Sequence, residues 1–459
     1  MTNESQRAWQ DPAGRCDRHL HVVGVAGVGM SAIAQALLND GCRVTGSDRY
    51  LDAGDRLEVL DRLERAGCRL VPQDGSAISA ETTAVVVSTA IEAGNPDLEA
   101  AARFGVPVVH RAAMLARLTE PARTVAVTGT AGKTTVTAMI GWLLEALGAD
   151  PLVVNGGEVS AWMAPDQIGS VRLGAGHWQV VEADESDGSL VEFHPAWSVI
   201  TNISKDHFEE AEVVRLFAAF AQQTREGIVC GPGVHERVCG AEPGAGWHEV
   251  APKTRRVDGG WEVEWRGAWV RSPMPGGHNA LNALLAMECV HRLGFAPDRI
   301  RSLLPQFRGV HRRLELVHDL GGIRVIDDYA HNPVKILATW RAASETAQRV
   351  VGVWRPHGFR PLAHMFDELV EAFSTACRRD DLLLLLPVFY AGGTAEATVD
   401  SRALAKALSA RGVRAAVFDG YDALGAEVRG LLRNGDTLLV MGARDPGLSR
   451  FAHAVARLV

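Results

Sequence analysis

Long apolar segments are absent from this sequence. No run of about 18 apolar residues, the length that a membrane-spanning helix requires, occurs in its 459 residues. The opening stretch, MTNESQRAWQDPAGRCDR, has no apolar core of a signal peptide. The 7 cysteines are scattered and include no Cys-x-x-Cys pair, as is typical of reduced thiols. These absences predict a cytoplasmic protein that does not insert into a membrane.

An excess of basic residues is absent as well. The chain has 47 Lys and Arg against 55 Asp and Glu, and its net charge is −8. Because nucleic-acid sites need clustered basic side chains, we expect no nucleic-acid partner. A local site for a small anionic ligand is still compatible with this charge. With 47% hydrophobic and 22% charged residues, the chain has the composition of a globular protein, and its length suggests roughly three domains.

What the sequence does contain is a repeated alternation of apolar strands and amphipathic helices. The pattern predicts an α/β fold with parallel, doubly wound sheets. We place three domains at 1–120, 121–313 and 314–459, of which the first and third are Rossmann-like. The stretch VDGGWEVEWRGAWV interrupts the alternation and predicts a short antiparallel hairpin.

The segment VAVTGTAGKTTVTAM resembles a phosphate-binding loop that lacks one glycine. The usual loop is G-x-x-x-x-G-K-[ST], but Val127 occupies the first glycine position here. A strand precedes Gly129 and a helix follows Gly132, so backbone N–H groups and the helix N-terminus can face phosphate oxygens. Lys133 can then reach the β and γ phosphates, and Thr134 can bind Mg²⁺. A purely structural glycine turn is the alternative. The residues predicted to bind ATP in this loop are Gly129, Thr130, Ala131, Gly132, Lys133, Thr134 and Thr135.

Carboxylates crowd the end of the next predicted strand in the same domain. VVEADESDGS places Glu182, Asp184, Glu185 and Asp187 within six residues. Such a group is unfavourable unless a cation or hydrogen-bond donors compensate its charge. We therefore predict a Mg²⁺ site beside the phosphates, with a solvated acidic turn as the alternative.

A second polar cluster follows the strand in VITNISKDHFEE. It contains Asn202, Asp206 and His207. Because parallel strands end at the same edge of a sheet, His207 could lie beside Glu182 and Thr134. A histidine in the core or at the surface is the simpler interpretation.

Two weaker signals concern nucleotides. In MPGGHNALNALL, Asn279 and Asn282 share one face of a predicted helix, and with His278 they could recognise a purine, although helix capping by Asn279 explains the pattern equally well. Near the start, GVAGVGMSA follows a strand and opens a helix, as in pyrophosphate-binding loops, without fitting G-x-G-x-x-G. Asp48, at the end of the second strand, could meet a ribose.

The motifs GVAGVGMS, GTAGKTT, EADES, TNISKDH, GGHNALN, GVHRR and DDYAHNP resemble, in this order, those of the Mur ligases of peptidoglycan precursor synthesis. The resemblance covers nearly the whole chain and is closest to the members that add L-alanine. It implies a first domain that binds a UDP-sugar, a central P-loop domain that binds ATP and Mg²⁺, and a third domain that closes over the site. The residues that match UDP-sugar-binding positions are Gly24, Gly27, Gly29, Met30, Ser31 and Asp48.

The resemblance also assigns roles within the other two domains. Lys133 and Thr134 match the phosphate lysine and the Mg²⁺ hydroxyl, and Glu182 and His207 match a second metal position. The remaining matches are His278, Asn279 and Asn282 on the adenine side, Arg313 and Asp328 as contacts of ATP, and His357 on the amino-acid side. The implied catalytic residues are Lys133, Glu182, His207 and His357.

The implied reaction is an ATP-dependent amide ligation in cell wall biogenesis, on which cell shape and division depend. ATP converts the carboxylate of UDP-N-acetylmuramate into an acyl phosphate, and the amine of a small amino acid, with L-alanine the first candidate, then attacks it. Four motifs depart from the pattern of the alanine-adding members. Ala131 replaces a histidine, Gly277 replaces an arginine, RPHGFRP replaces QPHRYTR, and DDYAHNP replaces DDYGHHP.

These departures keep other functions under consideration. One is a related ligase that attaches a recycled peptide or another amino acid, and another is a nucleotide-binding paralogue without catalysis. A dehydrogenase that uses the first glycine loop would leave the Gly-Lys-Thr-Thr sequence unexplained. Arg360, two residues after the position of a missing arginine, is a candidate replacement for it.

Overall fold

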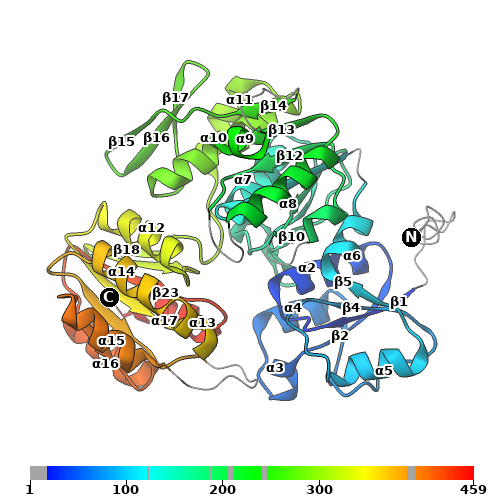
Figure 1. Cartoon of the computed structure of the whole chain (residues 1–459), viewed down its shortest axis with the longest axis horizontal. Helices are drawn as coiled ribbons and strands as arrows, with labels where there is room; N and C mark the ends of the chain where they lie inside the picture. Colours follow the sequence, from blue (N-terminus) through cyan, green and yellow to red (C-terminus); the bar gives the residue numbers. More distant parts are fainter. Residues whose placement is uncertain are drawn as a thin grey trace. The chain divides into compact units, whose positions relative to one another are not determined.

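The structure, a computed structural model, describes residues 18–120, 123–185, 189–204, 210–239, 246–389 and 399–458 (Figure 1). The chain forms two compact units. The first comprises Met1–Lys253 and Asn282–Arg308, and the second comprises Thr254–Leu281 and Gly309–Val459.

The first unit begins with a five-stranded parallel sheet in the order β3-β2-β1-β4-β5. Its strands are β1 (His19–Val23), β2 (Arg43–Ser47), β3 (Arg69–Val71), β4 (Thr82–Val87) and β5 (Val108–His110). Its helices are α2 (Val28–Asn39), α3 (Arg49–Asp52), α4 (Glu58–Arg65), α5 (Pro96–Phe104) and α6 (Arg111–Leu118). The strand order reverses at β1, which marks the usual ligand-binding edge of such a sheet.

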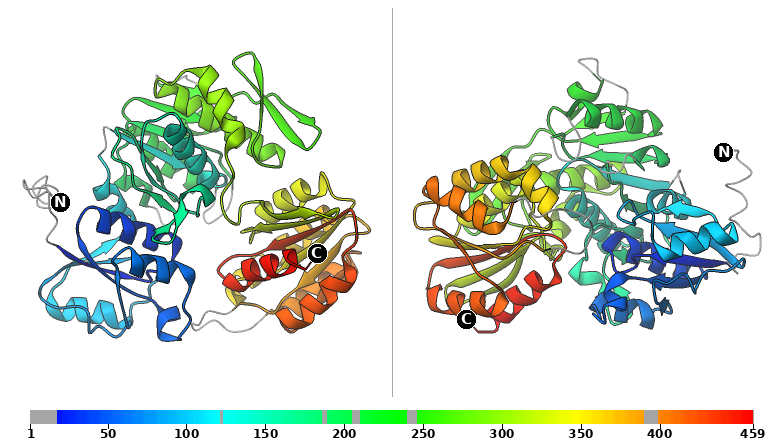
Figure 2. Two further views of the ribbon diagram at one scale, coloured as in Figure 1. Left: turned by 180° about the vertical axis from the view of Figure 1, so that it is seen from behind. Right: turned by 60° about the horizontal axis from the view of Figure 1, so that its bottom comes forward.

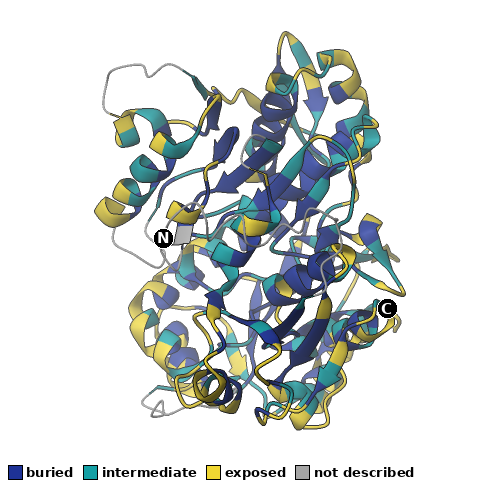
Figure 3. Cartoon of the chain, turned by 90° about the vertical axis from the view of Figure 1, so that its right-hand side faces the viewer, coloured by how far each residue is buried: buried dark blue, intermediate teal, exposed yellow. Residues whose placement is uncertain are grey.

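Both faces of this sheet are covered, as the uninterrupted apolar strands require. Val22 and Val86 face a core that includes residues of α2, α4 and α6, whereas Val23 and Val85 face a second core with α5. Figure 2 shows the blue sheet between its helices, and Figure 3 shows strands coloured as buried beneath helices that expose their outer faces.

A seven-stranded sheet follows in the order β10-β7-β11-β6-β12-β13-β14, parallel except for β10. Its strands are β6 (Thr124–Thr128), β7 (Leu152–Val154), β10 (Val171–Arg172), β11 (Gln179–Glu182), β12 (Trp197–Ile200), β13 (Gly227–Cys230) and β14 (Trp247–Glu249). A small antiparallel pair, β8 (Met163–Ala164) and β9 (Gln167–Ile168), lies between β7 and β10 in the chain. Because β6 lies between β11 and β12, the segments after all three strands lie at one edge.

Helices and short 3₁₀ turns complete the first unit. They are α7 (Lys133–Ala146), α8 (Glu210–Gln223), α9 (Val234–Cys239) and α11 (Pro297–Leu303), with η2 (Ser160–Trp162), η3 (Ser189–Glu192) and η4 (Leu304–Gln306). Helix α10 (Gly277–Arg292) begins in the second unit and continues into the first.

The second unit contains two sheets. The expected hairpin has a third strand and forms an antiparallel sheet of β15 (Thr254–Val257), β16 (Gly260–Trp265) and β17 (Ala268–Arg271). The larger sheet has the order β18-β19-β23-β20-β21-β22 and is parallel except for the edge strand β18. Its strands are β18 (Glu315–Leu320), β19 (Ile323–Asp328), β20 (Arg349–Trp354), β21 (Leu382–Leu385), β22 (Ala415–Val417) and β23 (Asp436–Met441).

Helices cover both faces of the larger sheet. Alternate strand residues such as Val350 and Val351 belong to two separate cores. One core includes residues of α12 (Pro333–Ser344), α14 (Phe366–Ala376) and α15 (Ser401–Ala410), and the other includes residues of α16 (Tyr421–Leu431) and α17 (Pro446–Ala456). A short helix, α13 (Phe359–His364), precedes α14.

Local sequence sets several helix starts. Asn95, Asn332 and Asp445 each accept a backbone N–H of the first turn, and each is followed by a proline at the first helical position. The side chain supplies the missing acceptor, and proline needs no partner for an N–H there.

The α/β fold with parallel, doubly wound sheets is confirmed, whereas the division at residues 120 and 313 stays a prediction. Among the described residues, no helix is long and apolar enough to cross a membrane. Cys68, Cys230, Cys239, Cys289 and Cys377 are free, as expected, but Cys42 is disulfide-bonded, so the expectation of reduced thiols is wrong there.

Candidate functional site

The loop between β6 and α7 depends on its two glycines. Gly129 and Gly132 have φ values of 131° and 86°, in the left-handed region that favours glycine. A β-carbon on Gly129 would lie 2.0 Å from the Thr201 hydroxyl oxygen, and one on Gly132 would lie 2.6 Å from Asn282 Oδ1. The backbone conformation and the close neighbours therefore both exclude residues other than glycine at these two positions.

The end of β12 holds this loop in place. Asn202 Oδ1 accepts the Thr130 hydroxyl at 2.6 Å and the Ala131 N–H at 3.1 Å. Asn202 Nδ2 and the Thr201 hydroxyl both donate to the Ala131 carbonyl, at 2.8 and 2.6 Å. Asn202 belongs to the polar cluster predicted after this strand. Its hydrogen bonds hold the phosphate loop in position.

Lys133 lies against the acidic segment that follows β11. Its Nζ is 2.6 Å from Glu185 Oε2, 3.5 Å from Asp184 Oδ1 and 2.9 Å from the Gly129 carbonyl oxygen. Burial disfavours the charged lysine, but the carboxylates of Glu185, Asp184 and Glu182 outweigh it and raise the pKa of Lys133. Burial also raises the pKa of Glu185, against the influence of Lys133. Lys133 is therefore a protonated cation in this site.

Thr134 and Glu182 meet at the same edge. The Thr134 hydroxyl donates to Glu182 Oε1 at 3.1 Å, and the Gly156 N–H donates to Glu182 Oε2 at 2.7 Å. A β-carbon on Gly156 would approach both Glu182 oxygens to 2.4 Å, so this carboxylate needs a glycine beside it. Glu185 is 1% exposed, so the alternative of a solvated acidic turn does not hold for this residue, whereas the Asp184 side chain is 30% exposed.

Three predicted residues of this region cannot be placed. Asp187, Asp206 and His207 lie outside the described residues. The prediction that His207 and Glu182 form a second metal position therefore stays a prediction.

The first turns of α10 carry the three residues predicted on the adenine side. Asn282 lies against Gly132 of the phosphate loop. The His278 ring lies near Gly276, and Asn279 Nδ2 donates to the Pro275 carbonyl at 2.7 Å. Capping by Asn279 does not fit, because the helix already includes Gly277 and His278.

The glycine loop after β1 is tied to the end of β2. Gly24, with φ 70°, donates its N–H to the Ser47 carbonyl at 2.8 Å. Asp48 accepts the Ala26 N–H at 2.9 Å and the Tyr50 N–H at 3.0 Å, so both its oxygens bind the backbone. Met30 and Ser31 are buried, and the Ser31 N–H donates to the Gly27 carbonyl at 2.8 Å. Gly27 is exposed and Gly29 half-exposed at the start of α2.

In the second unit, Asp328 is buried at the end of β19. It accepts the N–H groups of Leu314 and Ala330, both at 2.7 Å, and the Thr339 hydroxyl at 3.1 Å. Burial raises its pKa, against the influence of Arg313. Arg313 also lies over the Tyr329 ring, 5.2 Å from its centre. Asp328 thus anchors the segment before β18 that contains Arg313.

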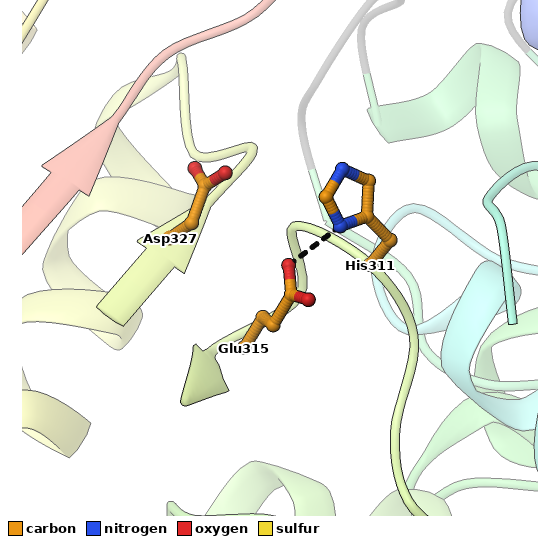
Figure 4. A group of neighbouring side chains, drawn as sticks. All are labelled: His311, Glu315 and Asp327. Atoms are coloured by element: carbon orange, nitrogen blue, oxygen red, sulfur yellow. Dashed lines mark ion pairs between the residues drawn. The ribbon is translucent and has the colours of Figure 1, made fainter. Parts of the chain in front are cut away.

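A group of charged residues lies beside the segment that contains Arg313. Figure 4 shows Asp327 across from His311 and Glu315, whose Nδ1 and Oε2 are 2.7 Å apart. Arg312 donates to Asp327 Oδ1 at 3.2 Å, and its backbone N–H donates to Glu315 at 3.0 Å. These contacts fix the chain just before and after Arg313.

His357 follows β20 in the same unit. Its ring centre is 5.0 Å from that of His331, in an edge-to-face arrangement. Arg360 is exposed in the first turn of α13.

Comparison with protein families matches three consecutive regions. Residues 19–123 match the "Mur ligase family, catalytic domain", 127–220 the "Mur ligase middle domain", and 312–444 the "Mur ligase, glutamate ligase domain". The chain belongs to the Mur ligase family.

Similar Mur ligases extend over nearly the whole chain. The UDP-N-acetylmuramate–L-alanine ligase of Sinorhizobium fredii is 37% identical over 92% of this chain and 94% of its own length. The ligase of the same name from Methylocella silvestris is 36% identical over 95% and 96%.

Solved structures agree with this membership. The UDP-N-acetylmuramate–alanine ligase MurC from Thermotoga maritima has a TM-score of 0.76 at 26% identity, covering 96% of this chain and all of that one. A murein peptide ligase from Psychrobacter arcticus, at 20% identity with a TM-score of 0.68 and coverage of 96% and 98%, shares the fold.

The structure adds contacts to this Mur ligase site that the sequence did not indicate. Gly156 follows a different strand from Glu182, yet donates to its carboxylate. Arg111, the first residue of α6, lies 3.2 Å from Asp184, 73 residues away. No local sequence pattern marks either contact.

Proposed function

We propose that this chain is an ATP-dependent ligase that joins L-alanine to the carboxylate of UDP-N-acetylmuramate in peptidoglycan precursor synthesis. The observation that carries the proposal is the phosphate loop, in which Lys133 and the Thr134–Glu182 pair meet at one sheet edge. Support also comes from relatives named UDP-N-acetylmuramate–L-alanine ligase, which are similar over more than nine-tenths of the chain.

Lys133 is the residue that acts on the transferred phosphoryl group. In phosphoryl transfer, catalysis consists mainly of positioning and of compensating negative charge. Lys133 is protonated and lies at the N-terminus of α7, whose backbone dipole also favours an anion. Phosphate oxygens would replace Glu185, its hydrogen-bonded partner, whereas Asp184 would stay close to it.

The donors beside Lys133 suit Mg²⁺. The hydroxyl of Thr134 and the carboxylate of Glu182 are hard oxygen ligands, 3.1 Å apart. When bound, Mg²⁺ neutralises charge that builds up on the phosphates. His207 is proposed as a further ligand.

The carboxylate of the acceptor would first be converted into an acyl phosphate. The amine of the amino acid would then attack this carbonyl, and the tetrahedral intermediate would collapse to an amide and phosphate. We assign the UDP-sugar to the glycine loop of Gly24, Gly27 and Gly29, with Asp48 holding that loop. His278, Asn279, Asn282, Arg313 and Asp328 are proposed to contact ATP, and His357 the amino acid.

The substrate side is where this chain departs from the alanine-adding pattern. Gly358 occupies an arginine position, and the missing guanidinium would have bound a carboxylate or phosphate. The competing assignment is therefore a relative that transfers another amino acid or a peptide. In either case we propose a cytoplasmic enzyme, because both UDP-sugars and ATP are cytoplasmic substrates.

Phosphate release from ATP, measured against a matrix of acceptors and amines, tests the function. We expect release that requires both UDP-N-acetylmuramate and L-alanine, with glycine and L-serine as weaker amines. Release with a tripeptide and no single amino acid would support the competing assignment. Absence of release with every pair would contradict ligase activity.

A further inference from the structure

Arg111 connects two segments that belong to different sheets of the first unit. It is the first residue of α6, and its Nη2 lies 3.2 Å from Oδ2 of Asp184, in the acidic segment after β11. The side chains are 23% and 30% exposed, respectively. This pair is thus shielded on most sides and still reachable by a ligand from solvent.

The same guanidinium borders the glycine loop. A β-carbon on Gly29, the second residue of α2, would lie 3.7 Å from Arg111 Nη1, an ordinary contact distance. The guanidinium therefore lies beside the backbone of the loop, and a β-carbon at position 29 would still fit. This is the loop to which the proposed function assigns the diphosphate of the UDP-sugar.

Asp184 does not depend on Arg111 alone for a counter-ion. Its Oδ1 lies 3.5 Å from Nζ of Lys133. One carboxylate is thus shared between two cations, and it keeps Lys133 as a partner if Arg111 turns to another anion. The exchange of partners costs less than it would for an isolated buried pair, which would leave a charge unpaired.

We propose that Arg111 binds the diphosphate of the nucleotide sugar directly and exchanges Asp184 for phosphate oxygens when this substrate binds. The inference rests on the proposed function, since it needs a diphosphate at the glycine loop. Arginine suits the role because its planar guanidinium donates two parallel hydrogen bonds to phosphate oxygens. Asp184 remains with Lys133, so Arg111 is a substrate-binding residue that the sequence motifs do not include.

The test compares the binding of UDP and of uridine to the full chain by calorimetry and competition. Arg111→Ala should raise the Kd for UDP by about 10- to 100-fold, the usual loss for hydrogen bonds between charged groups. The Kd for uridine should stay the same, because uridine has no phosphate. The matched control is Arg117→Ala, which removes the same charge from an exposed position of the same helix and should change neither Kd.

Asp184→Asn provides a second, independent variant. It removes the anion that competes for Arg111, so UDP should bind several-fold more tightly than to the wild type. Thermal melting of each variant checks the fold, and Asp184→Asn decides the matter if Arg111→Ala is unfolded. The inference is wrong if Arg111→Ala weakens UDP and uridine equally, or if Asp184→Asn fails to tighten UDP binding. A wild-type protein that neither binds UDP nor releases phosphate would instead contradict the proposed function.

Discussion

At the scale of single residues, Lys133 forms ion pairs with carboxylates of the site itself. Lys133 is hydrogen-bonded to Glu185, and Glu185 Oε1 has no hydrogen-bond partner in the described part of the chain. A buried carboxylate with one unsatisfied oxygen is costly by itself, and its ion pair with Lys133 offsets that cost. The pair keeps Lys133 charged until phosphate oxygens replace Glu185.

Arg360 carries the first residue-scale prediction. It is exposed in the first turn of α13, two residues after Gly358, where the alanine-adding pattern has an arginine. If Arg360 supplies the missing guanidinium, Arg360→Ala should raise the KM for the amino acid or the nucleotide sugar by about tenfold. The KM for ATP should stay the same, because the phosphate loop is untouched.

Steady-state kinetics with each substrate varied in turn measures this difference. Arg379→Ala is a suitable control, because Arg379 is an exposed arginine beyond the end of α14. If Arg360→Ala and the wild type have equal kinetics, Arg360 does not replace the arginine that the alanine-adding pattern has at position 358.

At the scale of elements, Asp381 fixes the start of β21 against its neighbours. This carboxylate is 1% exposed and accepts N–H groups from Val350 at 2.8 Å, the Arg378 backbone at 2.9 Å and Trp340 at 3.1 Å. Burial alone would raise the pKa of Asp381, but these donors and the Arg378 guanidinium lower it below its usual range. One side chain thus ties β20, β21 and α12 together.

We predict that Asp381→Asn destabilises the protein by about 3 kcal/mol at neutral pH, because it breaks a buried charged network. A depressed pKa gives stability that is complete above the unfolded-state pKa of about 3.9 and is lost as the pH falls through the folded value. The difference between variant and wild type should therefore shrink below about pH 4. Urea unfolding across this range measures it, with the exposed neighbour Asp380→Asn as control. If the difference in the free energy of unfolding does not change with pH, the charge of Asp381 is not the source of this stability.

The elements also show which parts of the structure could be predicted from the sequence alone. The meeting of Thr134 and Glu182 was predictable, because β6 and β11 are both apolar, parallel strands that end in polar residues at one edge. The third strand, β15, was missed because it precedes the stretch whose alternation reads as a hairpin. The contact between Arg111 and Asp184 joins segments of two different sheets, and no local periodicity records such packing. The roles of the candidate residues stay predictions.

At the scale of the whole molecule, the Mur ligase family accounts for the order of the chain. Its three regions follow one another with little sequence between the first two. The glycine loop, the phosphate loop and Asp328 each lie at the end of a strand of a parallel or mixed sheet. In the proposed reaction the first sheet contributes its edge to the UDP-sugar, and the other two contribute to ATP. A loss at the first edge should therefore affect the UDP-sugar selectively.

The most direct measurement is identification of the product by mass spectrometry in wild type and Lys133→Ala. With ATP, Mg²⁺, UDP-N-acetylmuramate and L-alanine, the wild type should form the amide of the two and one ADP for each amide. Lys133→Ala should lower this turnover by about 10²-fold or more, because it removes a charge that acts on the transferring phosphoryl group, yet it should still bind UDP, because the glycine loop and Arg111 are unchanged. Near-normal turnover in Lys133→Ala, or no amide from the wild type with any amino acid or peptide, would contradict the account.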